Sequence, residues 1–186
     1  MALQLVLIIP IVIIVIILIM FIYYFNKFAV LGNRIDNSLS QIDVQLRKRS
    51  DLVPNLIETV KGYAKHERKI MTEVTNARKA MLSAGTLPER MKAGNQLQSA
   101  LKSIFALAEN YPQLRANENF LQLQQELAAI EDKIAFARQY YNDSILSFNN
   151  SVLTFPGSFF AGIYGKKKRE FLQIPAELKA VPKVQF

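Results

Sequence analysis

Hydrophobic and polar positions divide the chain into an unbroken apolar segment and a longer stretch with helical periodicity. From Leu5 to Phe25 every residue is apolar or aromatic, and the first charged side chain is Lys27. As a helix, these roughly 21 residues would be about 31 Å long, which matches the hydrocarbon core of a bilayer. The start of the chain lacks the basic residues of a signal peptide. We therefore predict a single uncleaved transmembrane anchor over residues 1–26, with Pro10 inside the span.

Beyond the anchor, apolar residues recur every three or four positions, and no alternation with a period of two is present. Such stripes are typical of helices that bury one face against their neighbours. The pattern predicts an all-α fold: an N-terminal single transmembrane helix followed by an antiparallel up-and-down four-helix bundle with long helices over 27–153. The clearest stripe consists of Phe120, Leu123, Leu127, Ile130, Ile134, Ala137, Tyr141, Ile145, Phe148 and Val152.

The first two bundle helices are predicted over 27–49 and 51–84. In this interpretation Asp51 caps the second helix and Pro54 lies in its first turn, where a proline is tolerated. Two alternatives stay open, because the second segment is much longer than the first. Pro54 could kink one long helix, or Gly62 could break the second segment.

The later helix boundaries have clearer signals. Gly85 is expected to end the second segment, and Thr86 and Glu89 have the spacing of a capping box for the third. Pro112 interrupts the pattern before the last long helix, which is expected to run to about Leu153.

Composition excludes several classes of function. The chain has no cysteine and a single histidine, His66. This excludes disulfides, thiol catalysis, thiolate metal sites and a lipid-modified cysteine, as well as a two-histidine metal site within one chain. The net charge is +8, but the basic residues are scattered among acidic ones and form no nucleic-acid-binding motif. We expect no catalytic residue, no cofactor, no metal and no nucleic-acid partner.

The side of the membrane follows from the same charges. Lys27, Arg34 and the Arg47–Arg49 run follow the anchor, and no basic side chain precedes it. The positive-inside rule then places the bundle in the cytoplasm. The extracytoplasmic side remains the alternative.

Two polar groups are candidate sites. Tyr63, His66 and Glu67 have the spacing of one helix face, but one imidazole and one carboxylate fall short of the three ligands of a catalytic zinc site. We interpret them as a polar cluster that fixes helix register. Arg47, Arg49 and Asp51 surround the predicted corner, together with Lys48, Pro54 and Glu58, and are interpreted as ion pairs that hold it.

The tail, 154–186, combines aromatic residues with a basic run. Exposed apolar surface of this density needs a cover, and basic residues beside it favour anionic lipid. The candidate lipid-contact residues are Phe159, Phe160, Lys166, Lys167, Lys168 and Arg169.

Several segments resemble the LemA family. Gln45–Leu56, with Val60–Glu67, is similar to its hallmark, and 107–117 and 134–142 resemble its second and third motifs. Phe155–Phe171 resembles its closing segment. The resemblance implies a bacterial protein of the inner membrane, anchored by one helix, with an all-helical bundle and no established enzymatic activity.

These observations favour a non-enzymatic membrane-anchored scaffold or adaptor that acts through protein and lipid contacts and forms a homo-oligomer. The rival hypothesis is a regulatory subunit of a membrane protease or of another envelope machine. A helical-bundle enzyme comes third.

Overall fold

The computed structural model describes residues 2–172, with side chains from residue 8 onward. Leu5 therefore belongs to a described helix, but its side chain is not among those described. Residues 173–186 of the tail fall outside the described range. Over 2–172 the chain is helical and contains no strand. The helices are α1 (Ala2–Tyr63), α2 (Arg68–Ser83), α3 (Leu87–Ala108), α4 (Pro112–Arg115), α5 (Glu118–Leu153) and α6 (Gly157–Ile163).

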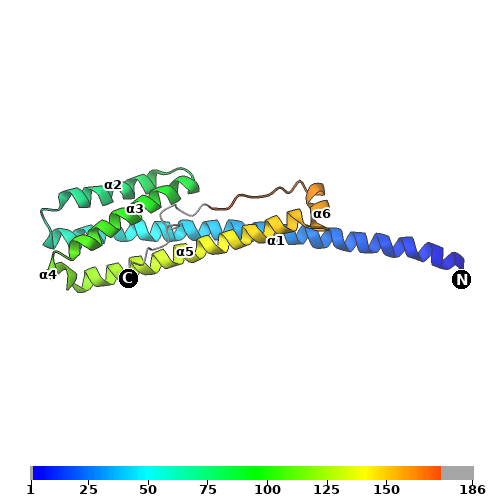
Figure 1. The fold of residues 1–186 in the computed structure, drawn as a ribbon, viewed down its shortest axis with the longest axis horizontal. Helices are drawn as coiled ribbons and strands as arrows, with labels where there is room; N and C mark the ends of the chain where they lie inside the picture. Colours follow the sequence, from blue (N-terminus) through cyan, green and yellow to red (C-terminus); the bar gives the residue numbers. More distant parts are fainter. Residues whose placement is uncertain (1, 173–186) are drawn as a thin grey trace, which may run out of the picture. The chain divides into compact units, whose positions relative to one another are not determined.

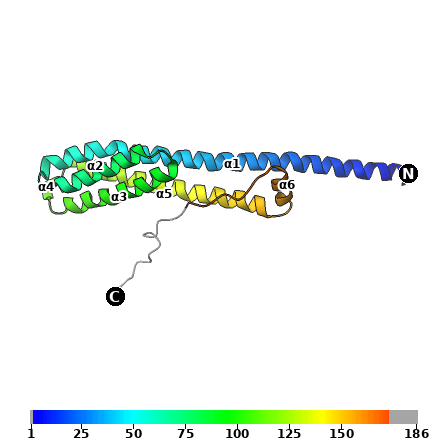
Figure 2. The same cartoon turned by 90° about the horizontal axis from the view of Figure 1, so that it is seen from above.

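The chain forms two compact units, which share the long helices α1 and α5. We call Ser38–Arg138 the hairpin unit, and Met1–Asn37 with Gln139–Phe186 the anchor unit. In the hairpin unit, α2 and α3 pack side by side as a helical hairpin (Figures 1 and 2). In the anchor unit, α6 lies against α1 (Figure 1).

The predicted turn at Asp51 is wrong, because α1 continues through it to Tyr63. Asp51 is an exposed residue of a helix interior and caps nothing. A proline in a helix leaves the carbonyl four residues earlier without its N–H donor. Here that carbonyl belongs to Ser50, and the Arg78 Nε–H of α2 donates to it at 2.8 Å. A side chain from another helix thus replaces the hydrogen bond that Pro54 cannot make.

This replacement predicts a specific coupling between Arg78 and Pro54. Arg78→Met should lower the free energy of unfolding by about 1–3 kcal/mol, because it leaves the buried Ser50 carbonyl without a donor. In a Pro54→Ala background the residue at position 54 regains its N–H, and the same substitution should cost much less. Denaturant unfolding of the four proteins, followed by circular dichroism, measures the coupling. Equal costs in both backgrounds would contradict it.

The predicted second helix over 51–84 is also wrong, because α1 ends at Tyr63, beside Gly62, and α2 begins at Arg68. The later boundaries are confirmed. Thr86 and Glu89 form the capping box of α3, in which each side chain accepts from the other residue's backbone N–H. Helix α3 ends before Pro112, and α5 ends at Leu153. Nine of the ten residues in the clearest predicted stripe are buried, Val152 being half-buried. The periodicity therefore located the face of α5 that packs inward.

The apolar part of α1 is long enough to cross a membrane, by length and composition. Within Ile8–Tyr63 an 18-residue window reaches a mean hydropathy of 3.1, and none of that window is buried in the chain. The described residues contain no other helix with these properties. A helix this apolar and this exposed needs an apolar environment around it.

Candidate membrane-interface site

An aromatic cluster in the anchor unit joins α6 to the end of the apolar segment of α1. The rings of Tyr24 and Phe160 stack with centroids 4.9 Å apart and planes 9° apart. The Tyr164 hydroxyl donates to the Phe21 carbonyl at 2.7 Å. Phe28 packs edge-on against Phe148 of α5, with centroids 5.9 Å apart. Because the cluster lies within a few residues of the first charged side chain, it sits where an anchored chain would enter the headgroup layer.

Helix α6 can approach this closely because it starts with a glycine. A Cβ atom at Gly157 would lie 2.2 Å from the Ser151 carbonyl oxygen and 3.1 Å from the Tyr24 ring. The first of these contacts is with backbone, which cannot move aside as a side chain can. Gly157 is therefore a condition for the docking of α6.

The two predicted aromatic lipid contacts lie in different environments. Phe160 is 4% exposed, and Tyr24 covers its ring, so this side chain packs within the chain. Phe159 is 62% exposed, and Phe155 and Ile163 are exposed beside the same short helix. These three side chains form an exposed apolar surface on α6 and the turn before it.

After α6, residues Lys166–Leu172 form an extended segment, which we call the strap. Two asparagines of α5 hold its main chain. The Asn149 side chain accepts from the Arg169 N–H and donates to the Arg169 carbonyl, both at 2.9 Å. The Asn142 side chain accepts from the Leu172 N–H at 3.0 Å and donates to the Leu172 carbonyl at 3.4 Å.

The basic run is divided by this docking. The Arg169 guanidinium forms an ion pair with Asp36 at 3.4 Å and lies 5.2 Å from the centre of the Phe148 ring. Lys166, Lys167 and Lys168 are exposed. Of the four predicted lipid-contact cations, these three lysines leave their charge at the surface, whereas Arg169 is held by the chain itself.

A shallow groove on α1, beside the aromatic cluster, contains Lys27, the first charged residue after the apolar segment. It has a volume of about 380 Å³ and is lined by Tyr23, Asn26, Lys27, Val30, Leu31 and Arg34. The Lys27 ammonium lies 5.9 Å and 5.6 Å from the centres of the Tyr23 and Tyr24 rings. Contacts of this kind hold an ammonium group beside aromatic rings at a membrane surface.

In the hairpin unit, Arg49 of the LemA-like segment Gln45–Leu56 lies in the core. Arg49 is 2% exposed, and its guanidinium pairs with Glu131 of α5 and donates to the Gly94 carbonyl of α3 at 3.3 Å. Burial lowers the pKa of Arg49, and the Glu131 charge opposes that shift. Arg47, by contrast, is exposed and pairs with Asp43 one turn earlier on α1, at 3.1 Å. The predicted corner does not exist: Arg49 ties α1 to α3 and α5, whereas Arg47 pairs within α1.

The predicted cluster at Tyr63, His66 and Glu67 is not on one helix face, because α1 ends at Tyr63 and α2 begins at Arg68. Glu67 accepts from the Tyr111 hydroxyl at 3.0 Å, which raises the pKa of that tyrosine. The Tyr63 hydroxyl accepts from the Asn117 amide at 3.0 Å. His66 is exposed. Two of the three residues thus tie the α1–α2 turn to the segments on either side of α4.

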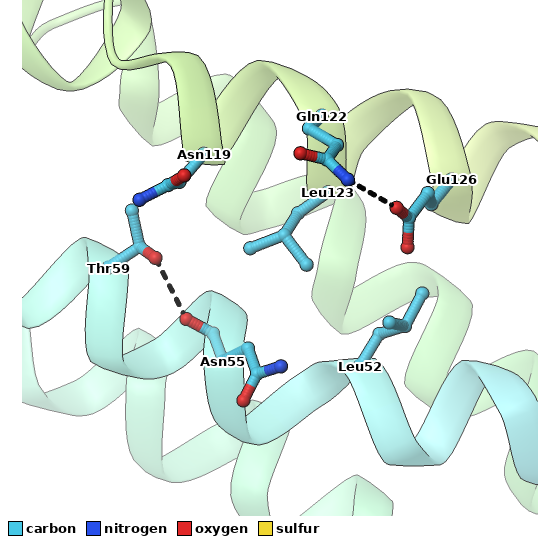
Figure 3. Close-up of a pocket in the computed structure, with 7 residues that line it drawn as sticks. All are labelled: Leu52, Asn55, Thr59, Asn119, Gln122, Leu123 and Glu126. Carbon is cyan, nitrogen blue, oxygen red and sulfur yellow. Dashed lines mark hydrogen bonds between the residues drawn. The ribbon is translucent and has the colours of Figure 1, made fainter.

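A second groove lies between α1 and α5 of the hairpin unit, with a volume of about 350 Å³ (Figure 3). Its described lining is rich in amides and carries one carboxylate. Figure 3 shows Gln122 donating to Glu126, and the Thr59 hydroxyl donating to the Asn55 carbonyl. The lining residues are Leu52, Asn55, Thr59, Asn119, Gln122, Leu123 and Glu126. Such a surface can bind polar groups, but it lacks the paired base and nucleophile of a hydrolytic site.

No group of three or more His, Asp or Glu side chains that could hold a metal ion occurs in the described part of the chain.

Sequence reasoning missed Asn142, Asn149 and Gly157. The two asparagines are seven residues apart and flank the apolar stripe of α5, so the same helix face carries both. That spacing is a usable signal, but the segment they hold has no periodicity that would identify it as their partner. Gly157 gives no periodic signal, because its role depends on how the chain turns back against the Ser151 carbonyl and on the distant Tyr24 ring.

Comparison with known proteins identifies relatives of this chain. A sequence model of the LemA family matches residues 38–186. Magnetosome protein MamQ 2 of Paramagnetospirillum magneticum is 23% identical over 175 residues, which cover 80% of this chain and 64% of that protein. Magnetosome protein MamQ of Magnetospirillum gryphiswaldense is 23% identical over 173 residues, covering 79% and 64%. Protein LemA of Metamycoplasma hominis is 27% identical over 126 residues, covering 66% and 57%.

The matched region thus spans less than two thirds of the length of each of these relatives. None of the three carries the name of an enzyme.

Proposed function

Because the chain belongs to the LemA family, we propose that it is a non-enzymatic membrane scaffold that acts through lipid and protein contacts and associates with further copies of itself. The observation that carries this proposal is the docking of α6 on the end of the apolar segment. The Tyr24–Phe160 stack and the Tyr164–Phe21 hydrogen bond hold the segment's end and the tail together. Such an arrangement is suited to holding a helical domain at a bilayer surface.

We infer that the hairpin unit works as an up-and-down four-helix bundle, formed by the segments of α1 and α5 within 38–138 together with α2 and α3. The contacts of Arg49 with α3 and α5 support this, as does the Arg78 contact between α2 and α1. A rigid bundle of this kind presents long polar faces to partners. The magnetosome proteins among its relatives are consistent with a role at a membrane.

Lipid contact is proposed for the apolar surface of α6 and for the exposed lysines of the strap. Each lysine near an anionic surface would contribute on the order of 1 kcal/mol at low salt. Changing Lys166, Lys167 and Lys168 to Gln should remove most of the extra thermal stability that the full chain gains in nanodiscs with anionic lipid over zwitterionic lipid.

A matched control changes three exposed lysines of the hairpin unit, Lys61, Lys65 and Lys69, to Gln. This control carries the same loss of charge and should keep the preference for anionic lipid. An equal loss in both triple variants would mean that net charge, and not the strap, accounts for the preference.

We propose that the chain resides in the bacterial inner membrane with the hairpin unit in the cytoplasm, since the basic residues follow the anchor. Lys79 is exposed on α2, and the chain has no cysteine. A cysteine introduced at position 79 should therefore react with a membrane-impermeant thiol reagent only after spheroplasts are lysed. Strong labelling of intact spheroplasts would place the unit on the other side.

A further inference from the structure

We propose that the groove on α1 beside Lys27 binds the headgroup of one anionic phospholipid, whose acyl chains lie along the apolar segment. The inference rests on the proposed scaffold function and deepens it, because it assigns a discrete lipid site to a chain held at a bilayer surface. The site differs from the contacts proposed for α6 and for the strap lysines, since it takes a single lipid molecule of defined charge.

The groove lies on the face of α1 that α6 leaves open. Helix α6 and its C-cap pack on Phe21, Tyr24 and Phe28, which are three and four positions apart and so share one helix face. Val30 follows Phe28 by two residues and therefore lies about 200° further around the helix. Val30 lines the groove and is 51% exposed. The groove is thus accessible to a molecule from outside the chain.

The apolar part of the groove continues the exposed surface of the apolar segment. Tyr23 and Val30 line the groove. Ile16 and Ile19 precede Tyr23 by seven and four positions, which places them on the same helix face. All four side chains are exposed. An acyl chain that lies along this stripe brings the glycerol and phosphate of its lipid to the level of Lys27.

The polar part of the groove carries two cations. Its described lining contains Lys27, Arg34 and the Asn26 amide, and no carboxylate. Side chains of a helix tilt toward its N-terminus, so Arg34 extends toward Lys27 and the apolar segment. Guanidinium and ammonium groups form strong, charge-assisted hydrogen bonds with phosphate oxygens. The two positive charges favour an anionic headgroup over a zwitterionic one, whose own ammonium they repel.

Contacts within the chain place Lys27 for this role. The side chain is half-buried, and its ammonium lies 5.9 Å and 5.6 Å from the centres of the Tyr23 and Tyr24 rings. The ring faces attract the charge, while the N–H groups of the ammonium can still donate to phosphate oxygens. Because the side chain is already restricted, less of its conformational entropy is lost when the lipid binds.

Native mass spectrometry of the full-length chain tests the site, because it counts the lipids that each copy retains. The chain is released from mild detergent that contains equal amounts of phosphatidylglycerol and phosphatidylcholine. We expect one retained phosphatidylglycerol per copy of the chain. Changing Lys27 and Arg34 together to Gln should lower its occupancy by about tenfold or more, since two cations that face the headgroup are lost. The helicity of this variant, measured by circular dichroism, should be unchanged.

Matched variants separate the groove from a general effect of charge. Lys48→Gln with Lys61→Gln removes two exposed lysines from the same helix and should keep the retained lipid. Lys27→Arg with Arg34→Lys preserves both charges of the groove and should keep it as well. Added inorganic phosphate should not displace the lipid, because free phosphate lacks the acyl chains that lie along α1.

Equal occupancy in the Lys27/Arg34 and Lys48/Lys61 glutamine variants would overturn the inference, whether both keep the lipid or both lose it. Displacement by inorganic phosphate would also overturn it, since the groove would then bind phosphate alone. If the glutamine variant of the three strap lysines still loses the preference for anionic nanodiscs, the proposed lipid contact of the strap survives and only the groove fails. A chain that retains no phosphatidylglycerol and shows no preference for anionic nanodiscs would remove both.

Discussion

Replacing Glu131 with glutamine is expected to cost about 3 kcal/mol of unfolding free energy, and more than replacing Arg49 with methionine. Arg49 is 2% exposed, whereas the Glu131 side chain is 38% exposed. Glu131→Gln leaves a buried guanidinium without its counterion, and breaking a buried ion pair from one side typically costs about 3–5 kcal/mol. Arg49→Met leaves a carboxylate that water can reach, so its cost should be smaller. Chemical unfolding followed by circular dichroism measures both.

The control for this prediction is Asp132→Asn, which removes an exposed acid from the next position of α5. It should change the stability by less than about 0.5 kcal/mol, as surface substitutions usually do. The double variant Arg49→Met with Glu131→Gln should be more stable than Glu131→Gln alone, because no unpaired charge is then buried. Equal costs for Glu131→Gln and Asp132→Asn would show that the pair contributes nothing to stability.

Replacing Gly157 with alanine should force α6 away from the end of α5 and, with it, from Tyr24 of α1. The added Cβ would lie 2.2 Å from the Ser151 carbonyl oxygen, and overpacking of this kind costs about 1–3 kcal/mol. A cysteine introduced at Ala161, which is 2% exposed on α6, reports the release through its rate of reaction with a thiol reagent. We expect that rate to rise about tenfold or more in the Gly157→Ala background, since about 1.4 kcal/mol corresponds to a factor of ten in an opening equilibrium.

Gly162 provides the matched control on the same helix, because nothing lies within 4 Å of a Cβ built there. Gly162→Ala should leave the labelling rate unchanged or lower it slightly, since alanine favours a helix over glycine. If Gly157→Ala and Gly162→Ala react at the same rate, close packing at Gly157 does not hold α6 in place.

The sequence was sufficient to predict the features that depend on neighbouring residues. The stripe on α5, the capping box at Thr86 and the interruption at Pro112 are local patterns, and each appears where it was expected. The apolar segment before Lys27 was also evident from the sequence, because it contains no charged side chain. All of these follow from propensity and periodicity within about one helix length.

The features that the sequence did not reveal depend on distant residues. Pro54 predicted a helix start, but Arg78 on another helix satisfies the carbonyl that the proline leaves free. Arg49 was assigned to a corner because it is charged, yet it continues the buried face of Leu46 and Val53. Only the position of Glu131, far along the chain, makes that burial possible. Tertiary hydrogen bonds and ion pairs thus overrode the local signals.

The central claim, a self-associating membrane scaffold without catalysis, is tested most directly by the composition of the complex that the full chain forms. The tagged chain is purified from native membranes in mild detergent, and its partners are identified and quantified by mass spectrometry. The account predicts multiple copies of this chain with bound anionic lipid and no second protein in stoichiometric amount. A stoichiometric membrane protease, with a single copy of this chain, would contradict it and support a regulatory subunit instead.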